Sequence, residues 1–253
     1  MKLTDFTTML ETIAPASLAL GFDNVGLLIG TEREIRRVLV ALDCSVAVAE
    51  EAIAMDADLV LTHHPLFLHG VKRILPDDPE TAAAYKLIRA GIGLFAAHTN
   101  LDACAGGVND ALADALGVSD AKPLFADGIG RVGSLEAPMT LGAFADRCSE
   151  ALGTVVRFSG DPEGIVRRVG LVGGAGGSDA AEAKALGCDV FVTGEVKHHE
   201  AIAAAALRMP LIEGGHYETE AVVLKNWISR LQNEGNDVQY TLTRMETAPW
   251  QTR

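Results

Sequence analysis

The sequence predicts an α/β protein made of two duplicated, related halves, each with a mostly parallel β-sheet. Residues 36–64 can be laid over residues 167–195 without a gap. In each copy an apolar run, an Ala-rich segment of helical character and a second apolar run follow one another, as a strand, a helix and a strand would. Histidines and carboxylates come after these runs, and functional residues of such sheets lie at the carboxyl ends of the strands. We therefore predict a metal site at the seam between the halves.

The overlay depends on residues that are identical at matched positions. They are Arg36-Arg37-Val38 with Arg167-Arg168-Val169, Glu51-Ala52 with Glu182-Ala183, Asp58 with Asp189, and Thr62 with Thr193. Two unrelated βαβ units that share a common pattern are the alternative, but one long repeat favours a duplicated domain. We predict that residues 1–125 and 235–253 form one half and residues 126–234 the other.

Further elements are expected outside the two copies. They are a helix over residues 4–14 capped by Thr4, a turn and short strand within 20–30, strands over 130–135 and 154–158, a helix over 141–152, and a closing strand over 238–245.

Composition limits the classes of partner. The chain has 253 residues, 49% of them apolar, and a formal net charge of −13. This charge would repel the phosphates of a nucleic acid, so we expect no nucleic-acid partner, whereas divalent cations would be attracted. The chain lacks the ~18-residue apolar stretch that a membrane span needs, and its N-terminus lacks the layout of a secretory signal. We expect a cytoplasmic protein that does not enter a membrane.

The cysteines do not form a metal-binding pattern. None of them belongs to a Cys-x-x-Cys pair, which argues against a zinc ribbon or an iron–sulfur cluster. We expect all of them to be small buried residues: Cys44, Cys104, Cys148 and Cys188.

Two adjacent histidines follow the second apolar run of the first copy. Pro65 biases His64 toward an extended conformation, and neighbouring side chains of an extended chain point to opposite sides. One ion could not easily bind both imidazoles, whereas two ions could bind one each. A histidine pair that only packs at a strand end is the alternative. His63 and His64 therefore favour a dinuclear metal site.

Three further residues complete the candidate ligand set. In the second copy His216 and Glu220 lie on one helix face if their i, i+4 spacing is helical. With Asp102, His63 and His64 they form a set of imidazoles and carboxylates, which suits zinc, manganese, iron or nickel. Five ligands cannot saturate two divalent ions, so water must complete the shells. A hydroxide that bridges the ions would be a nucleophile near neutral pH, which predicts a metal-dependent hydrolase with a small-molecule substrate.

Two residues are candidates for catalytic roles. His98 matches His216 when residues 94–102 are laid over 212–220. It is either a further ligand or a group that positions Asp102 or relays protons, and we favour the second role. Glu195, in the segment "GEVKHHE" with Lys197, could act as a general acid or base, and a solvated loop is the alternative.

A glycine-rich segment, Gly173–Gly177, follows the first apolar run of the second copy. Backbone N–H groups in this position can hold a phosphate, although the segment fits neither the dinucleotide nor the Walker pattern. The alternative is a simple tight turn.

These motifs resemble the GTP cyclohydrolase I type 2 homologue family, also described as Nif-three-like proteins. The shared segments occur in one order: "FDNVGLLIG", "LTHHPLF", "HTNLD", "GEVKHHE" and "GHYETE". Phe22 departs from the family's usual Trp. The resemblance implies two metal ions bound through the five ligands named above, and a homohexameric ring assembled from dimers.

The sequence leaves two classes of function open. The first is hydrolysis at the metal centre, with GTP, another nucleotide or a phosphoester as the substrate. The second is a non-enzymatic role, in metal binding or as a scaffold for a protein partner. The incomplete metal shells favour the enzyme.

Overall fold

A computed structural model describes residues 1–235, 237–245 and 248–250. The chain divides into two compact units. The first comprises Met1–Cys104 with the described part of Leu224–Thr247, and the second comprises Ala105–Val223 with the described part of Ala248–Arg253. Among the described residues, no helix has the length and apolarity needed to cross a membrane.

The first unit contains one five-stranded sheet and its covering helices. Its elements are α1 (Leu3–Ile13), η1 (Ala16–Leu18), β1 (Gly26–Ile29), β2 (Arg37–Ala41), α2 (Val46–Ala54), β3 (Leu59–Thr62), α3 (Ala82–Ala90), β4 (Gly93–Ala96), α4 (Thr99–Ala103) and β11 (Gln239–Leu242). The strand order is β1-β4-β3-β2-β11, and every neighbouring pair except β1 and β4 is parallel. The prediction of a mostly parallel sheet is confirmed here.

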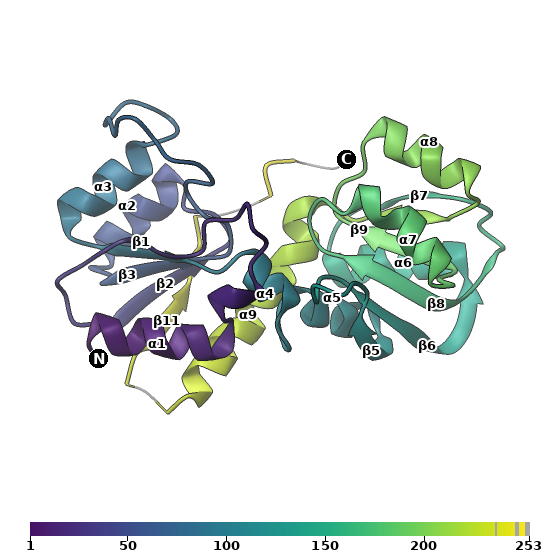
Figure 1. Cartoon of the computed structure of the whole chain (residues 1–253), viewed down its shortest axis with the longest axis horizontal. Helices are drawn as coiled ribbons and strands as arrows, with labels where there is room; N and C mark the ends of the chain where they lie inside the picture. Colours follow the sequence, from purple (N-terminus) through teal and green to yellow (C-terminus); the bar gives the residue numbers. More distant parts are fainter. Residues whose placement is uncertain (236, 246–247, 251–253) are drawn as a thin grey trace. The chain divides into compact units, whose positions relative to one another are not determined.

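Helices cover both faces of this first sheet, with α2 and α3 on one face and α1 on the other (Figure 1). Leu39 of β2 and Val60 of β3 pack with Leu87 of α3 in the core beneath α2 and α3. The hydroxyl of Ser45 accepts a hydrogen bond from the Val48 N–H and so caps α2. The buried strands end at the edge of the sheet where the predicted polar residues begin.

The second unit contains a six-stranded sheet. Its elements are α5 (Val108–Leu116), β5 (Val118–Pro123), β6 (Arg131–Thr140), α6 (Leu141–Leu152), β7 (Arg157–Ser159), β8 (Ile165–Val172), η2 (Gly177–Asp179), α7 (Ala180–Ala185), β9 (Val190–Thr193), α8 (His198–Ala206) and β10 (Leu211–Glu213). Helix α9 (His216–Asn233) begins in this unit, and its residues from Leu224 onward belong to the first.

The second sheet is parallel only in its duplicated part. The strand order is β5-β6-β8-β9-β10-β7, and only β8, β9 and β10 run parallel to one another. The outer strands pair in antiparallel fashion, β5 with β6, β6 with β8, and β7 with β10. Only for β5 and β6 does a short connection, residues 124–130, require this direction, because a parallel pair needs a crossover of a dozen or more residues.

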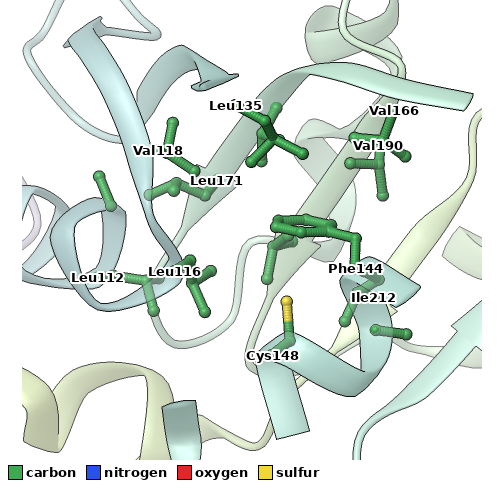
Figure 2. Packing of buried hydrophobic residues seen from close by; sticks show 14 of the residues in the cluster. Leu112, Leu116, Val118, Leu135, Phe144, Cys148, Val166, Leu171, Val190 and Ile212 are labelled. Carbon is green, nitrogen blue, oxygen red and sulfur yellow. The ribbon is translucent and has the colours of Figure 1, made fainter. Parts of the chain in front are cut away.

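Apolar residues alternate between the two faces of this second sheet. Leu171, Val190 and Ile212 point toward α5 and α6, where Phe144 and Cys148 complete the core (Figure 2). Val172, Phe191 and Leu211 belong to the core on the opposite face, beneath α7 and α8. All the cysteines are buried, as predicted, and all are free thiols.

The duplication extends to matched hydrogen bonds. Oδ2 of Asp58 accepts from the N–H groups of Arg36 and Arg37, each at 2.9 Å. Oδ2 of Asp189 accepts from the N–H groups of Arg167 and Arg168, each at 2.8 Å. In both units one carboxylate therefore ties the start of the second parallel strand to the start of the first, which supports the overlay of the copies.

Three expectations differ from the structure. Helix α1 has Lys2 rather than Thr4 at its N-cap, and Thr4 lies in the first turn. Strand β5 was not expected, because its side chains are mostly exposed. The expected boundary after residue 125 also differs from the observed units, because β5 pairs with β6 in the second sheet. Residues 236, 246–247 and 251–253 of the predicted first half lie outside the described residues.

The remaining expected elements are present with adjusted ends. The predicted helix over 141–152 coincides with α6, and the hydroxyl of Thr140 caps it. The predicted strands correspond to β1, the longer β6, the shorter β7, and β11.

Candidate metal centre

His63 is buried immediately after β3. Its Nδ1 lies 2.9 Å from the carbonyl oxygen of Ala97. A carbonyl oxygen can only accept, so Nδ1 carries the proton and Nε2 is the basic nitrogen. That Nε2 lies 3.6 Å from Oδ1 of Asp102. His63 therefore presents Nε2 next to a carboxylate, an arrangement that could hold a metal ion.

His64 is oriented by a carboxylate from the neighbouring strand. Asp43 follows β2, and its Oδ1 lies 2.8 Å from Nδ1 of His64. This contact leaves Nε2 of His64 as the candidate ligand nitrogen, in the arrangement common among metal-binding histidines.

His98, which precedes α4, has the same kind of support. Its Nδ1 lies 2.9 Å from Oδ1 of Asp23, and Oδ2 of Asp23 accepts from the N–H of Thr99 at 3.0 Å. Burial raises the pKa of Asp23, but hydrogen bonds from Thr99 and His98 outweigh it, and the pKa is lowered overall. Burial and the nearby His63 lower the pKa of His98, against the opposing effect of Asp23. The neutral imidazole is thus favoured.

The three imidazoles of the first unit form a cluster. Ring centroids are 4.9 Å apart for His63 and His64, 5.2 Å for His63 and His98, and 5.5 Å for His64 and His98. One ligand atom of each lies within 4.8 Å of the others, so the cluster could hold a metal ion. The expectation that His63 and His64 point to opposite sides is wrong, because both lie beyond the last residue of β3, where strand alternation has ended.

The second unit contributes an imidazole and two carboxylates. Nδ1 of His216 lies 3.0 Å from Oε1 of Glu195, and Nε2 lies 3.2 Å from Oε2 of Glu220. His216 and Glu220 are one helical turn apart at the start of α9, on one face as expected. Glu220 is buried at 4% exposure, so its charge favours a cationic partner.

The glycine-rich segment is a tight turn in which three of the five backbone N–H groups already have side-chain acceptors. The N–H of Gly173 donates to Oδ1 of Asn109 at 3.0 Å. The N–H of Gly174 donates to Oγ1 of Thr219 at 3.1 Å, and that of Gly176 to Oγ1 of Thr193 at 2.9 Å. Because side chains of the same unit satisfy these donors, the turn does not need a bound anion. The structure favours the tight-turn interpretation over the phosphate cradle.

The remaining predicted residues lie at the surface. Glu195 contacts His216, which gives it an orienting position in addition to the acid or base role predicted from sequence. Lys197 precedes α8, where its N–H donates to Oε2 of Glu200 at 2.8 Å. His198, His199 and His69 are exposed.

Sequence reasoning missed two residues that support the histidines, Asp23 and Asp43. Asp43 carried a usable signal, because it lies just beyond the end of β2, after Leu42, at the edge of the sheet where functional residues were expected. Asp23 lies in the first of the recognised motifs, but it is distant from His98 in the sequence.

Four histidines thus share one orientation. His63, His64, His98 and His216 each hold Nδ1 near an oxygen acceptor. Packed core histidines have no reason to share this orientation. Metal ligands and histidines that transfer a proton at Nε2 do, because the acceptor at Nδ1 selects the tautomer that leaves Nε2 basic. The donor set fits a transition-metal ion.

Comparisons with known proteins show the family and the fold of this chain. A family model described as Duf34/NIF3 (NGG1p interacting factor 3) matches residues 1–249. The chain is 34% identical to a GTP cyclohydrolase 1 type 2 homolog of Clostridium perfringens over 99% of both chains. It is similar in structure to a Staphylococcus aureus hypothetical protein, with a TM-score of 0.94, 31% identity and coverage of 100% of this chain and 99% of the other. It also resembles reduced HcgD from Methanocaldococcus jannaschii, with a TM-score of 0.82, 29% identity and coverage of 96% and 97%.

Proposed function

The chain belongs to the Duf34/NIF3 family, and from that premise we propose that it is a dinuclear metal-dependent hydrolase. The observation that carries the proposal is the common orientation of the four histidines, each with Nδ1 near an oxygen acceptor. In this proposal His63, His64, Asp102, His216 and Glu220 bind two divalent ions, zinc, manganese, iron or nickel. His63, His64 and Asp102 belong to the first unit, and His216 and Glu220 belong to the second.

The protein's own residues have separate tasks in this proposal. Bound divalent ions would supply Lewis acidity and lower the pKa of coordinated water. Asp43 and Glu195 hold the imidazoles of His64 and His216 in the orientation that leaves Nε2 for metal binding. His98, oriented by Asp23, moves a proton at Nε2. Glu195 is the second acid or base candidate.

The substrate in this proposal is a small molecule with an electrophilic carbon or phosphorus. Relatives named GTP cyclohydrolase 1 type 2 homolog make GTP the first compound to test, followed by other nucleotides and phosphoesters. The alternative function is metal binding without catalysis, or a scaffold for a protein partner. His98 is oriented by Asp23 but is not one of the five proposed ligands, which favours catalysis, because a storage site does not need an oriented proton carrier.

Metal analysis of the purified protein tests the ligand set. We expect close to two transition-metal ions per chain, and we expect Asp102→Asn and His64→Ala each to lose at least one. His69→Ala is the matched control, because His69 is an exposed histidine of the loop that follows β3. Full metal content in both ligand variants would contradict the proposed centre.

A substrate panel with added manganese or zinc separates the two functions. We expect the wild type to turn over at least one nucleotide or phosphoester and Glu220→Gln to lose that turnover by more than about 100-fold. Turnover that is equal in both proteins, or absent across the panel while metal is bound, would favour the non-enzymatic role.

We further propose that the protein is cytoplasmic and forms a homohexamer. The assembly follows from the family resemblance and is tested by light scattering on the protein eluting from a sizing column. A mass of six chains is expected, and a monomer would contradict the proposed ring.

A further inference from the structure

Gly174 is in direct contact with the carboxylate of Glu220. It adopts a φ of +67°, a conformation that favours glycine. A Cβ at this position would overlap Oε1 of Glu220, and it would lie 3.1 Å from Cδ of Glu220 and 3.3 Å from Nε2 of His216. The backbone of Gly174 therefore forms the wall against which the carboxylate rests.

Buried side chains hold this wall in place. Thr219, immediately before Glu220 on α9, accepts from the N–H of Gly174 and donates to the carbonyl oxygen of Gly215 at 2.8 Å. Thr193 donates to the carbonyl oxygen of Gly174 at 3.1 Å. Both threonines have no exposed surface. The turn, the end of β9 and the start of α9 are thus connected by hydrogen bonds that water does not reach.

We infer that Gly174 and Thr219 are positioning residues that set the Glu220 carboxylate against His216 for metal binding. The inference rests on the proposed function, because it takes Glu220 to be a metal ligand. The physical reason is close packing: a rigid wall behind a carboxylate limits its rotamers, so less conformational entropy is lost when an ion binds. Residues that support ligands in this way typically alter metal affinity by about 10–100-fold when changed.

A matched pair of glycine substitutions tests the wall. Gly153 also has a φ of +67°, but nothing lies within 4 Å of a Cβ there. Gly174→Ala and Gly153→Ala therefore share the backbone strain, and only the first displaces Glu220. Titration of the metal-free protein with zinc should show affinity about 10-fold or more weaker for Gly174→Ala and unchanged within about 2-fold for Gly153→Ala.

Two further measurements separate positioning from general structural damage. Cobalt(II) bound to Gly174→Ala should show a visible absorption spectrum different from that of the wild type, whereas Gly153→Ala should reproduce the wild-type spectrum. Glu220→Asp withdraws the carboxylate by about 1.5 Å. The double variant with Gly174→Ala should therefore bind zinc no more weakly than Glu220→Asp alone, since the overlap is gone.

The hydroxyl of Thr219 supplies a second test if Gly174→Ala fails to fold. Thr219→Val removes the acceptor of the Gly174 N–H at nearly constant volume, and Thr219→Ser retains it. We expect zinc affinity about 10-fold weaker for the valine variant and close to wild type for the serine variant.

The outcomes distinguish this inference from the proposed function. If Glu220→Gln binds zinc as the wild type does, the proposed centre fails. If Glu220→Gln weakens zinc binding but Gly174→Ala matches Gly153→Ala and Thr219→Val matches Thr219→Ser, the centre stands and the positioning roles of Gly174 and Thr219 are overturned.

Discussion

The two units use the same strand ends for different residues. After β2 the first unit has Asp43, which orients His64 beyond β3. In the overlay Asp43 matches Gly174, and His64 matches Glu195. In the second unit the orienting carboxylate is therefore that of Glu195, which follows β9. It orients His216, the first residue of α9. Duplication has preserved the positions that present polar groups and the pairing of an imidazole with a carboxylate, while the residues at those positions have changed.

The cores of the two units also differ at one matched position. Leu39 of β2 is fully buried beneath α2 and α3, and its match in β8 is Gly170. A Cβ on Gly170 would lie 3.0 Å from Sγ of Cys188 and 3.3 Å from Cβ of Ala183. Helix α7 therefore approaches β8 closely, and the second unit needs glycine where the first needs a large side chain.

The largest expected effect is on stability at this pair. Leu39→Gly should lower the free energy of unfolding by about 4 kcal/mol, because it leaves a cavity and loosens a strand. Gly170→Ala should lower it by about 1–2 kcal/mol through overpacking. Urea denaturation followed by circular dichroism measures both. A stabilising Gly170→Ala would show that α7 does not limit the space above β8.

A smaller effect on stability is expected at the two matched aspartates. Asp58 and Asp189 each accept two backbone N–H groups, but Asp58 is buried and Asp189 only partly so. Asp58→Ala should therefore lower the free energy of unfolding by about 3 kcal/mol and Asp189→Ala by about 1.5 kcal/mol. The reason is that an N–H group left without its acceptor destabilises the fold more when it is buried. Asp77→Ala, at an exposed carboxylate, is the control in the same denaturation series. An equal loss of unfolding free energy at Asp58 and Asp189 would show that burial does not determine the size of the effect.

The smallest expected effect concerns the two orienting carboxylates. Their side chains are similarly exposed, at 55% for Asp43 and 59% for Glu195. Asp43→Ala and Glu195→Ala should therefore each weaken zinc binding by about 10-fold, while Asp43→Asn and Glu195→Gln retain an acceptor and should stay close to wild type. Zinc titration compares the four variants.

The glutamine variant also tests the second role of Glu195. If Glu195→Gln keeps its zinc but loses turnover, Glu195 acts as an acid or base. If it keeps both, its role is orientation alone. A large loss of zinc affinity in Asp43→Ala without one in Glu195→Ala would show that the two carboxylates do not have equivalent orienting roles.

Local patterns predicted helix α6 well and helix α1 less well. For α6, Thr140 precedes a clear apolar stripe, and its hydroxyl accepts from the N–H of Ala143. At the start of α1, Thr4 has the same chemistry, yet the helix begins at Leu3. The N–H groups of Asp5 and Phe6 both donate to the carbonyl oxygen of Lys2, so the backbone alone starts the turn.

The overlay of residues 94–102 on 212–220 differs by one residue from the register of the strand pairs. Thr62 pairs with Ala96, and His98 follows two residues later. The matching Thr193 pairs with Glu213, and His216 follows three residues later, after Gly215 with a φ of +87°. His98 therefore precedes its helix, whereas His216 begins one. The difference explains why His98 joins the other imidazoles of its unit, while His216 faces a carboxylate one turn along α9.

Apolar periodicity was enough to predict the duplicated strands, their order with the helices between them, and the edge at which the polar residues gather. These features follow from burial and from the alternation of side chains, which are local properties of the chain. The antiparallel outer strands, the close approach at Gly170 and the carboxylates Asp23 and Asp43 behind the histidines depend on residues far apart in the chain. Only packing brings such residues together, because space and hydrogen-bond geometry select among partners that the local pattern treats alike.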